Sequence, residues 1–166
     1  MNPYFLETWT DFFVAAAGAA AALAGLVIVA ISVNIQQILK FKHLPARAAA
    51  TISTLVLILV SCMAGLIRQD PTFFAWEILA FGIGAWIMQL RSNRQAFAVG
   101  QEFQRPPWES ALETVVGQIQ TLPFIVASIL LLQGNLRGIY WMAAGVIAIF
   151  IFSVMNVWVL LVEILR

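Results

Sequence analysis

Long runs of apolar residues alternate with short polar breaks along the whole chain. A helix that crosses the hydrocarbon core of a bilayer needs about 20 mostly apolar residues, at a rise of 1.5 Å per residue. Five segments satisfy this requirement, at about residues 11–39, 46–67, 72–90, 112–132 and 138–165. The pattern predicts an all-α fold, an integral membrane bundle of about five transmembrane helices with short loops, in a single domain over residues 1–166.

The polar breaks contain residues that begin and end helices. Asp70 is placed to cap a helix that begins at Pro71, because proline at a first helical position loses no hydrogen bond. Pro106 and Pro107 end the helix that precedes them. The polar stretch before these prolines predicts that the third helix extends beyond the membrane to about residue 105.

The fourth segment is less apolar than the others. Gln118, Gln120 and Thr121 interrupt its first half, and Pro123 removes one backbone donor. If only residues 122–132 are apolar enough, the segment is too short for a core about 30 Å thick. A four-span protein with an interfacial helix is therefore the alternative.

Composition supports the membrane class and excludes others. Hydrophobic residues make up 62% of the chain and charged residues 10%, whereas soluble domains have roughly 45–50% and about 25%. A net charge of +1 without a basic run predicts no nucleic-acid partner. The first segment lacks a basic flank and is longer than a signal peptide, so we expect it to remain in the mature protein.

Residues that could carry catalysis or bind a metal are few. The single cysteine, Cys62, excludes an internal disulfide and a thiolate cluster, and the single histidine, His43, stands in a basic loop. The chain has no nucleophile-elbow, zinc-protease, phosphate-loop or dinucleotide motif. We therefore predict no enzyme activity, no cofactor and no metal site.

Basic residues predict the orientation, because loops rich in Lys and Arg remain cytoplasmic. With the N-terminus outside, the outer side holds Arg68 and Arg137. The cytoplasmic side then holds Lys40, Lys42, Arg47, Arg91, Arg94, Arg105 and Arg166. This distribution predicts an N-out, C-in topology.

One face of the first segment is nearly free of bulky side chains. Alternating steps of four and three place its residues on one side of a helix: Asp11, Ala15, Gly18, Ala22, Gly25, Val29, Ser32 and Gln36. We call this the small-residue face. Small residues let helices approach closely in lipid, which predicts either the packed centre of the bundle or a contact between subunits. The alternative is that copies surround a pore, with Asp11 near the outer mouth and Ser32 and Gln36 at the inner end.

Amides and hydroxyls gather in the predicted cytoplasmic half of the spans. They are Asn34, Gln36, Gln37, Thr51, Thr54, Gln89, Gln118, Gln120, Thr121 and Asn156. Polar groups in hydrocarbon must find partners or water. These side chains therefore either bond helix to helix or line an inward-open vestibule for an ion or small solute.

Glu77 is the acidic residue that lies well inside a predicted span. A carboxylate in the membrane is costly and is by default a functional hypothesis. If Glu77 is deep, it is a candidate proton or cation site. If it lies near the outer interface beside Trp76, it is expected to pair with Arg68 or Arg137.

The opening segment W-T-D-F-F-V-A-A-A-G-A-A-A-A-L-A-G-L-V-I-V-A-I-S-V-N, from Trp9 to Asn34, resembles a family of small, uncharacterised bacterial inner-membrane proteins. Some members of that family carry a label as modulators of a membrane-anchored ATP-dependent protease. The resemblance covers the first span and little else. It implies a multi-pass protein of the bacterial inner (plasma) membrane, and it carries no defined activity or site residues.

Two classes of function fit these patterns. The first is a homo-oligomeric channel or transport-like protein, which predicts a symmetric oligomer with a water-filled path. The alternative is a non-catalytic accessory or structural protein that binds and modulates a larger membrane complex, which predicts a dry bundle and an apolar groove facing a partner. The short loops leave little room for a solute site within one chain, which favours the oligomer. The expected partners are the lipid bilayer, further copies of the chain or another membrane protein.

Overall fold

The computed structural model describes residues 5–33, 35–38, 44–102 and 107–164, and most of these residues are helical with no strand among them. A short 3-10 helix, η1 (Leu6–Trp9), precedes the first long helix. The α-helices are α1 (Thr10–Val33), α2 (Ile35–Ile38), α3 (Leu44–Leu66), α4 (Pro71–Glu102), α5 (Pro107–Leu132) and α6 (Gly138–Ile164). The predicted all-α bundle is confirmed.

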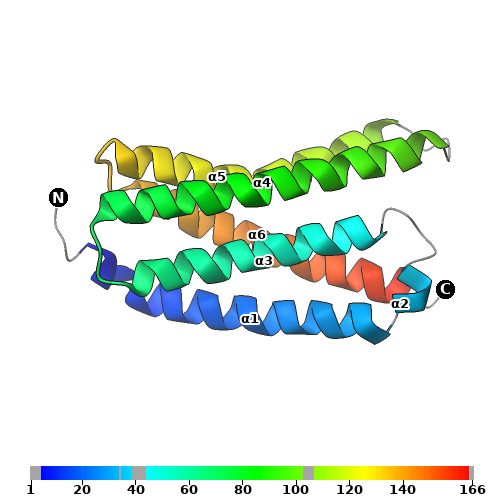
Figure 1. Cartoon of the computed structure of the whole chain (residues 1–166), viewed down its shortest axis with the longest axis horizontal. Coiled ribbons are helices and arrows are strands. Elements are labelled where there is room, and N and C mark those ends of the chain that lie inside the picture. The colour runs from blue at the N-terminus through cyan, green and yellow to red at the C-terminus, as the bar shows by residue number, and fades with distance from the viewer. Residues whose placement is uncertain (1–4, 34, 39–43, 103–106, 165–166) are drawn as a thin grey trace.

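The five long helices lie side by side along one axis, and consecutive long helices run in opposite directions (Figure 1). The most extensive packing joins α4 to α5, α1 to α3, α5 to α6 and α3 to α4, and smaller contacts join α6 to α1 and α3. We call the end that carries η1 and the turns at residues 67–70 and 133–137 the η1 end. The opposite end, which carries α2, is called the α2 end (Figure 1).

Four helical segments among the described residues are long and apolar enough to cross a membrane. They are Leu6–Val33, Ala48–Leu66, Pro71–Arg94 and Gly138–Trp158. In α5 the apolar part is Gly117–Leu132, which at 1.5 Å per residue is about 24 Å long. The chain is therefore a multi-pass membrane protein in architecture, and α5 as a fifth span stays a prediction.

Local chemistry sets the helix ends at the η1 end of the bundle. The Asp70 side chain accepts a hydrogen bond of 2.8 Å from the backbone N–H of Thr72, and α4 begins at Pro71. This bond favours the ionised carboxylate and holds the pKa of Asp70 below its ordinary value. After α5, Gly134 adopts a φ of 82°, a left-handed conformation that glycine reaches without steric cost.

Aromatic rings packed on glycines hold neighbouring helices together. The Phe13 ring of α1 is fully buried and lies directly over Gly65 of α3. In the same way, the ring of Phe124 in α5 lies over Gly145 of α6. Because lipid gives helices no hydrophobic reason to associate, close packing of this kind supplies the attraction.

The helix α4 is longer than a bilayer core requires. Its 32 residues span about 48 Å at 1.5 Å per residue, compared with a core about 30 Å thick. It continues past Arg94 to Glu102 as one helix, and residues 103–106 lie outside the described part of the chain. The N-terminal part of α5 lies beside it at the α2 end of the bundle (Figure 1).

Candidate functional site

The small-residue face lies on the outside of the bundle. Its members are all exposed: Asp11, Ala15, Gly18, Ala22, Gly25, Val29, Ser32 and Gln36. A Cβ atom built on Gly18 or Gly25 would meet no atom within 4 Å. The alternative in which this face forms the packed centre of the chain's own bundle is therefore wrong.

The opposite face of α1 makes the internal contact. It buries Phe13, Ala16, Ala20 and Val27. The aromatic ring of Phe13 selects this side, because it fits over Gly65 and meets Phe74 edge-on at a centroid distance of 5.9 Å. Two alanines in the buried set are as small as those on the exposed face. Residue size alone therefore did not reveal which side would turn inward.

Polar residues stand at both ends of the small-residue face. Asp11 is exposed in the first turn of α1, at the η1 end. At the other end the Ser32 hydroxyl donates to the Ile28 carbonyl at 2.7 Å, which satisfies it within the helix. Gln36 is exposed on α2, a separate short helix, and Asn34 between the two helices lies outside the described residues.

A layer of buried hydroxyls and amides crosses the bundle. Asn156 of α6 donates from Nδ2 to Oγ1 of Thr51 in α3 at 3.4 Å, and Thr54 Oγ1 donates to the Thr51 carbonyl at 2.9 Å. On α5, Gln120 and Thr121 are buried as well. Several of the predicted polar groups therefore bond within and between helices. We call the described ones among them the polar layer: Thr51, Thr54, Gln118, Gln120, Thr121 and Asn156. The side chain of Gln37 lies outside the described ones.

The polar layer continues between α4 and α5. Trp86 Nε1 donates a short hydrogen bond to Oε1 of Gln118, whereas the Nε2 of Gln118 is buried without a partner among the described atoms. Gln89 packs directly on Gly117 of α5. Counted from the η1 end, Thr51, Trp86, Gln118 and Asn156 all lie about 20–27 Å along their helices.

Two buried serines were missed by sequence reasoning. Ser61 and Ser153 are buried, and neither hydroxyl has a hydrogen-bond partner in the described structure. Serine in a helix usually bonds to a carbonyl one turn back, so the sequence offered no signal that these hydroxyls would differ. Ser153 precedes Asn156 by three residues and extends the polar layer toward the η1 end.

Glu77 is partly buried and lies close to the turn at the η1 end. Gln69 Nε2 donates to Glu77 Oε2 at 2.7 Å and also to the Ala64 carbonyl at 2.9 Å. The arginine of this turn, Arg68, instead places its Nε 3.5 Å from Oε1 of Glu7. The partner of Glu77 is therefore an amide rather than an arginine, and this position matches the interfacial interpretation.

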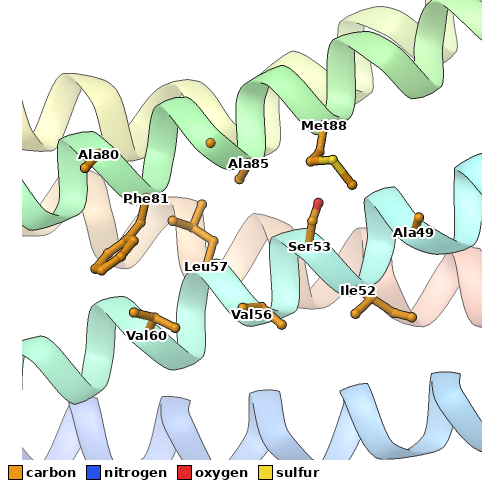
Figure 2. A pocket seen from close by; sticks show the side chains of 11 residues that line it. Ala49, Ile52, Ser53, Val56, Leu57, Val60, Ala80, Phe81, Ala85 and Met88 are labelled. Atoms are coloured by element: carbon orange, nitrogen blue, oxygen red, sulfur yellow. The ribbon is translucent and has the colours of Figure 1, made fainter.

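An apolar groove of about 530 Å³ lies between α3 and α4 (Figure 2). Its lining residues are Ala49, Ile52, Ser53, Val56, Leu57, Val60, Ala80, Phe81, Gly84, Ala85 and Met88. The one hydroxyl in this lining, on Ser53, donates to the Ala50 carbonyl at 2.8 Å. The groove therefore offers almost no polar group to an occupant, unlike the vestibule that the sequence suggested.

Within the described part of the chain, no group of three or more His, Cys, Asp or Glu side chains could hold a metal ion. These features define a multi-pass α-helical membrane protein with an exposed small-residue face, a buried polar layer and an apolar groove. No family model, curated protein or solved structure matches the chain. The resemblance of the first helix to a bacterial membrane family remains a prediction.

Proposed function

We propose that the protein is a homo-oligomeric channel or transport-like protein of the bacterial inner membrane, in which the small-residue faces of several copies meet. The observation that carries the proposal is the exposure of α1. Its span has the highest mean hydropathy of the four, 2.5, yet 17% of it is buried, compared with 56% in α3. The chain's own bundle therefore leaves much of the surface of its most apolar span exposed.

Physical chemistry favours a helical neighbour on this face. Gly18 and Gly25 leave open space where a Cβ would stand, so the backbone of another helix can approach closely. Helices in lipid associate through close packing rather than through a hydrophobic driving force. Seven residues separate the two glycines, which is the repeat of left-handed helix packing, so one partner helix can contact both.

A path for ions or small solutes fits between copies better than within one chain. The polar layer inside the bundle is engaged in hydrogen bonds between Asn156 and Thr51 and between Trp86 and Gln118. By contrast, the small-residue face carries Asp11 at one end and Gln36 near the other, both exposed. A ring of copies would place an acidic group at the mouth that faces the η1 end.

Filling the small-residue face should break the oligomer. We expect Gly18→Leu or Gly25→Leu to weaken association at least tenfold, about 1.4 kcal/mol, because a leucine holds the two backbones apart. Native mass spectrometry of the protein released from lipid nanodiscs measures the oligomer. Ala144→Leu, at an exposed position of α6, is the matched control and should leave it intact. Equal oligomer sizes in all three variants would refute this interface.

A pore of this kind should conduct cations. We expect liposomes that contain the protein to release K⁺, and Asp11→Asn to slow the release because it removes the acidic group at the mouth. The difference should shrink at high salt, since the Debye length falls from about 30 Å at 0.01 M to about 3 Å at 1 M. An oligomer without K⁺ release in the unaltered protein would contradict the channel and leave the interface standing.

A second candidate, a non-catalytic accessory protein that docks on a larger membrane complex, is favoured by the apolar groove. A protein of that class is expected to have a dry bundle and an apolar groove that faces a partner. The groove between α3 and α4 is lined by apolar side chains (Figure 2). A chain that stays monomeric in nanodiscs and releases no K⁺ would support this candidate over the first.

A further inference from the structure

The groove between α3 and α4 has the length of one bilayer leaflet. On α3 its lining runs from Ala49 to Val60, which is about 16 Å at 1.5 Å per residue. One leaflet contributes about 15 Å, half of the hydrocarbon core. On α4 the lining ends at Met88, toward the α2 end. The groove therefore extends from the membrane surface at the α2 end to about the middle of the bilayer.

Small residues keep the groove open along its length. A Cβ atom on Gly84 would meet nothing within 4 Å, and Ala49 and Ala80 are exposed beside it. The neighbouring glycine, Gly82, faces α5 instead and packs against Phe124. The groove is thus a gap that the packing of α3 on α4 leaves unfilled (Figure 2).

The lining of the groove indicates the kind of occupant. About 530 Å³ of space is bordered almost wholly by apolar side chains. A single acyl chain is unbranched, narrow and entirely apolar, so it fits both the volume and the lining. Lipid is also the solvent that surrounds this face in a membrane.

A basic side chain stands at the surface end of the groove. Arg91 follows Met88 by three residues, so it continues the stripe of α4 that carries Phe81, Gly84 and Met88 one turn further. Arg91 is exposed and makes no ion pair or hydrogen bond with a described residue. A guanidinium in this position suits a phosphate, to which it can donate two parallel hydrogen bonds.

We propose that the α3–α4 groove is a binding site for an anionic phospholipid, with one acyl chain in the groove and the phosphate at Arg91. The site is independent of the oligomer proposed above, because α1 contributes nothing to its lining. Its expected preference is for phosphatidylglycerol over phosphatidylcholine. One arginine near a membrane surface accounts for about a fivefold preference.

Photo-crosslinking locates the lipid directly. The protein is reconstituted with phosphatidylglycerol that bears a diazirine on one acyl chain, irradiated and digested with trypsin. Cleavage after Arg47, Arg68 and Arg91 places the α3 lining in peptide 48–68 and the α4 lining in peptide 69–91. We expect lipid adducts to concentrate in these two peptides. Adducts spread evenly over the peptides of all spans would overturn the proposal.

Two variants with matched controls test the two halves of the site. Gly84→Leu puts a side chain into the groove at a position where its Cβ meets no atom within 4 Å, and it should remove the adducts that Ala144→Leu retains. Arg91→Gln should lose the fivefold preference for phosphatidylglycerol in native mass spectrometry, whereas Arg137→Gln at the η1 end should keep it. An unchanged adduct pattern in Gly84→Leu would overturn the site. An Arg91→Gln protein that keeps the preference would overturn the role of this arginine.

Discussion

The contact between Phe13 and Gly65 shows how one glycine positions a whole helix. A Cβ atom at Gly65 would lie 2.6 Å from Cε2 of Phe13, closer than side-chain atoms normally approach. The ring occupies the space that a side chain would fill, and it also meets Phe74 edge-on. This contact anchors the first turns of α1 against α3 and α4 near the η1 end.

We expect Gly65→Ala to destabilise the protein by about 1–3 kcal/mol, because overpacking a filled contact displaces the ring or the helix. Unfolding in mixed detergent, followed by circular dichroism, measures the change. Gly82→Ala is the control, since a Cβ atom there would meet its nearest neighbours, Ile125 and Phe124, at 3.6 Å, an ordinary contact distance. It should be neutral or stabilise by up to about 1 kcal/mol, the helix preference for alanine over glycine.

A second substitution separates the steric cause from a change in helix propensity. Phe13→Leu shortens the side chain that faces Gly65 and should recover part of the loss when it is combined with Gly65→Ala. If the two losses instead add, the ring and the glycine are independent, and the account of this contact is wrong.

Sequence reasoning succeeded at residues whose chemistry acts locally. Asp70 and Pro71 begin α4 as predicted, because a cap depends on neighbours within a few residues. It failed where the answer depends on a distant helix. Gly82 and Gly84 look alike in the sequence and suggest packing, yet Gly82 contacts α5 and Gly84 borders an open groove. No local pattern states which face a neighbour will cover.

At the scale of elements, α5 shows why average hydropathy underestimates a span. The polar residues that interrupt its apolar run, Gln120 and Thr121, are buried inside the bundle. The side chains that α5 exposes in the same stretch are Val115, Ile119 and Leu122. Lipid would therefore meet an apolar face, and the polar groups would not oppose insertion of the folded hairpin of α4 and α5.

This arrangement predicts that α5 crosses the membrane. Single cysteines are placed at Arg68, Arg94 and Gln133, all exposed, in a Cys62→Ala background. In sealed vesicles, a membrane-impermeant maleimide should label the cysteines at 68 and 133 from one side and the cysteine at 94 from the other. Labelling of 133 together with 94 would instead show that α5 turns back, giving the four-span alternative.

The helix α1 has a face that the sequence reveals but does not orient. Its small-residue face is recognisable from spacing alone, and the structure leaves that spacing intact from Asp11 to Ser32. Whether such a face turns inward or outward depends on competing contacts elsewhere. Phe13, on the other side, decides it by fitting over Gly65. A face that is conspicuous in the sequence can thus be the one that remains free for other molecules.

At the scale of the whole molecule, the two ends of the bundle differ in charge. Arg91 and Arg94 lie toward the α2 end, and the topology predicted from the sequence assigns Lys40, Lys42, Arg47, Arg105 and Arg166 to the same side of the membrane. The η1 end has Arg68 and Arg137, and Glu7 lies beside Arg68. Glu102, Glu109, Glu113 and Glu163 belong to the α2 end, but acidic residues contribute little to orientation. The asymmetry therefore favours an α2 end that faces the cytoplasm.

This asymmetry predicts that green fluorescent protein fused after Arg166 folds in the cytoplasm and fluoresces, whereas alkaline phosphatase at the same position stays inactive. Both reporters are needed, because a missing signal from one alone would not distinguish wrong sidedness from poor expression.

Moving positive charge from the α2 end to the η1 end should weaken the preference for one orientation. The variant combines Arg91→Gln and Arg94→Gln with Gln133→Lys and Asn135→Lys, which changes the balance of basic residues from seven against two to five against four. We expect that variant to insert in both orientations and to show activity from both reporters. Active phosphatase with dark fluorescent protein in the unaltered chain would reverse the orientation. The lipid groove would then open toward the outer leaflet, since Arg91 and the groove share the α2 end whichever way the bundle is inserted.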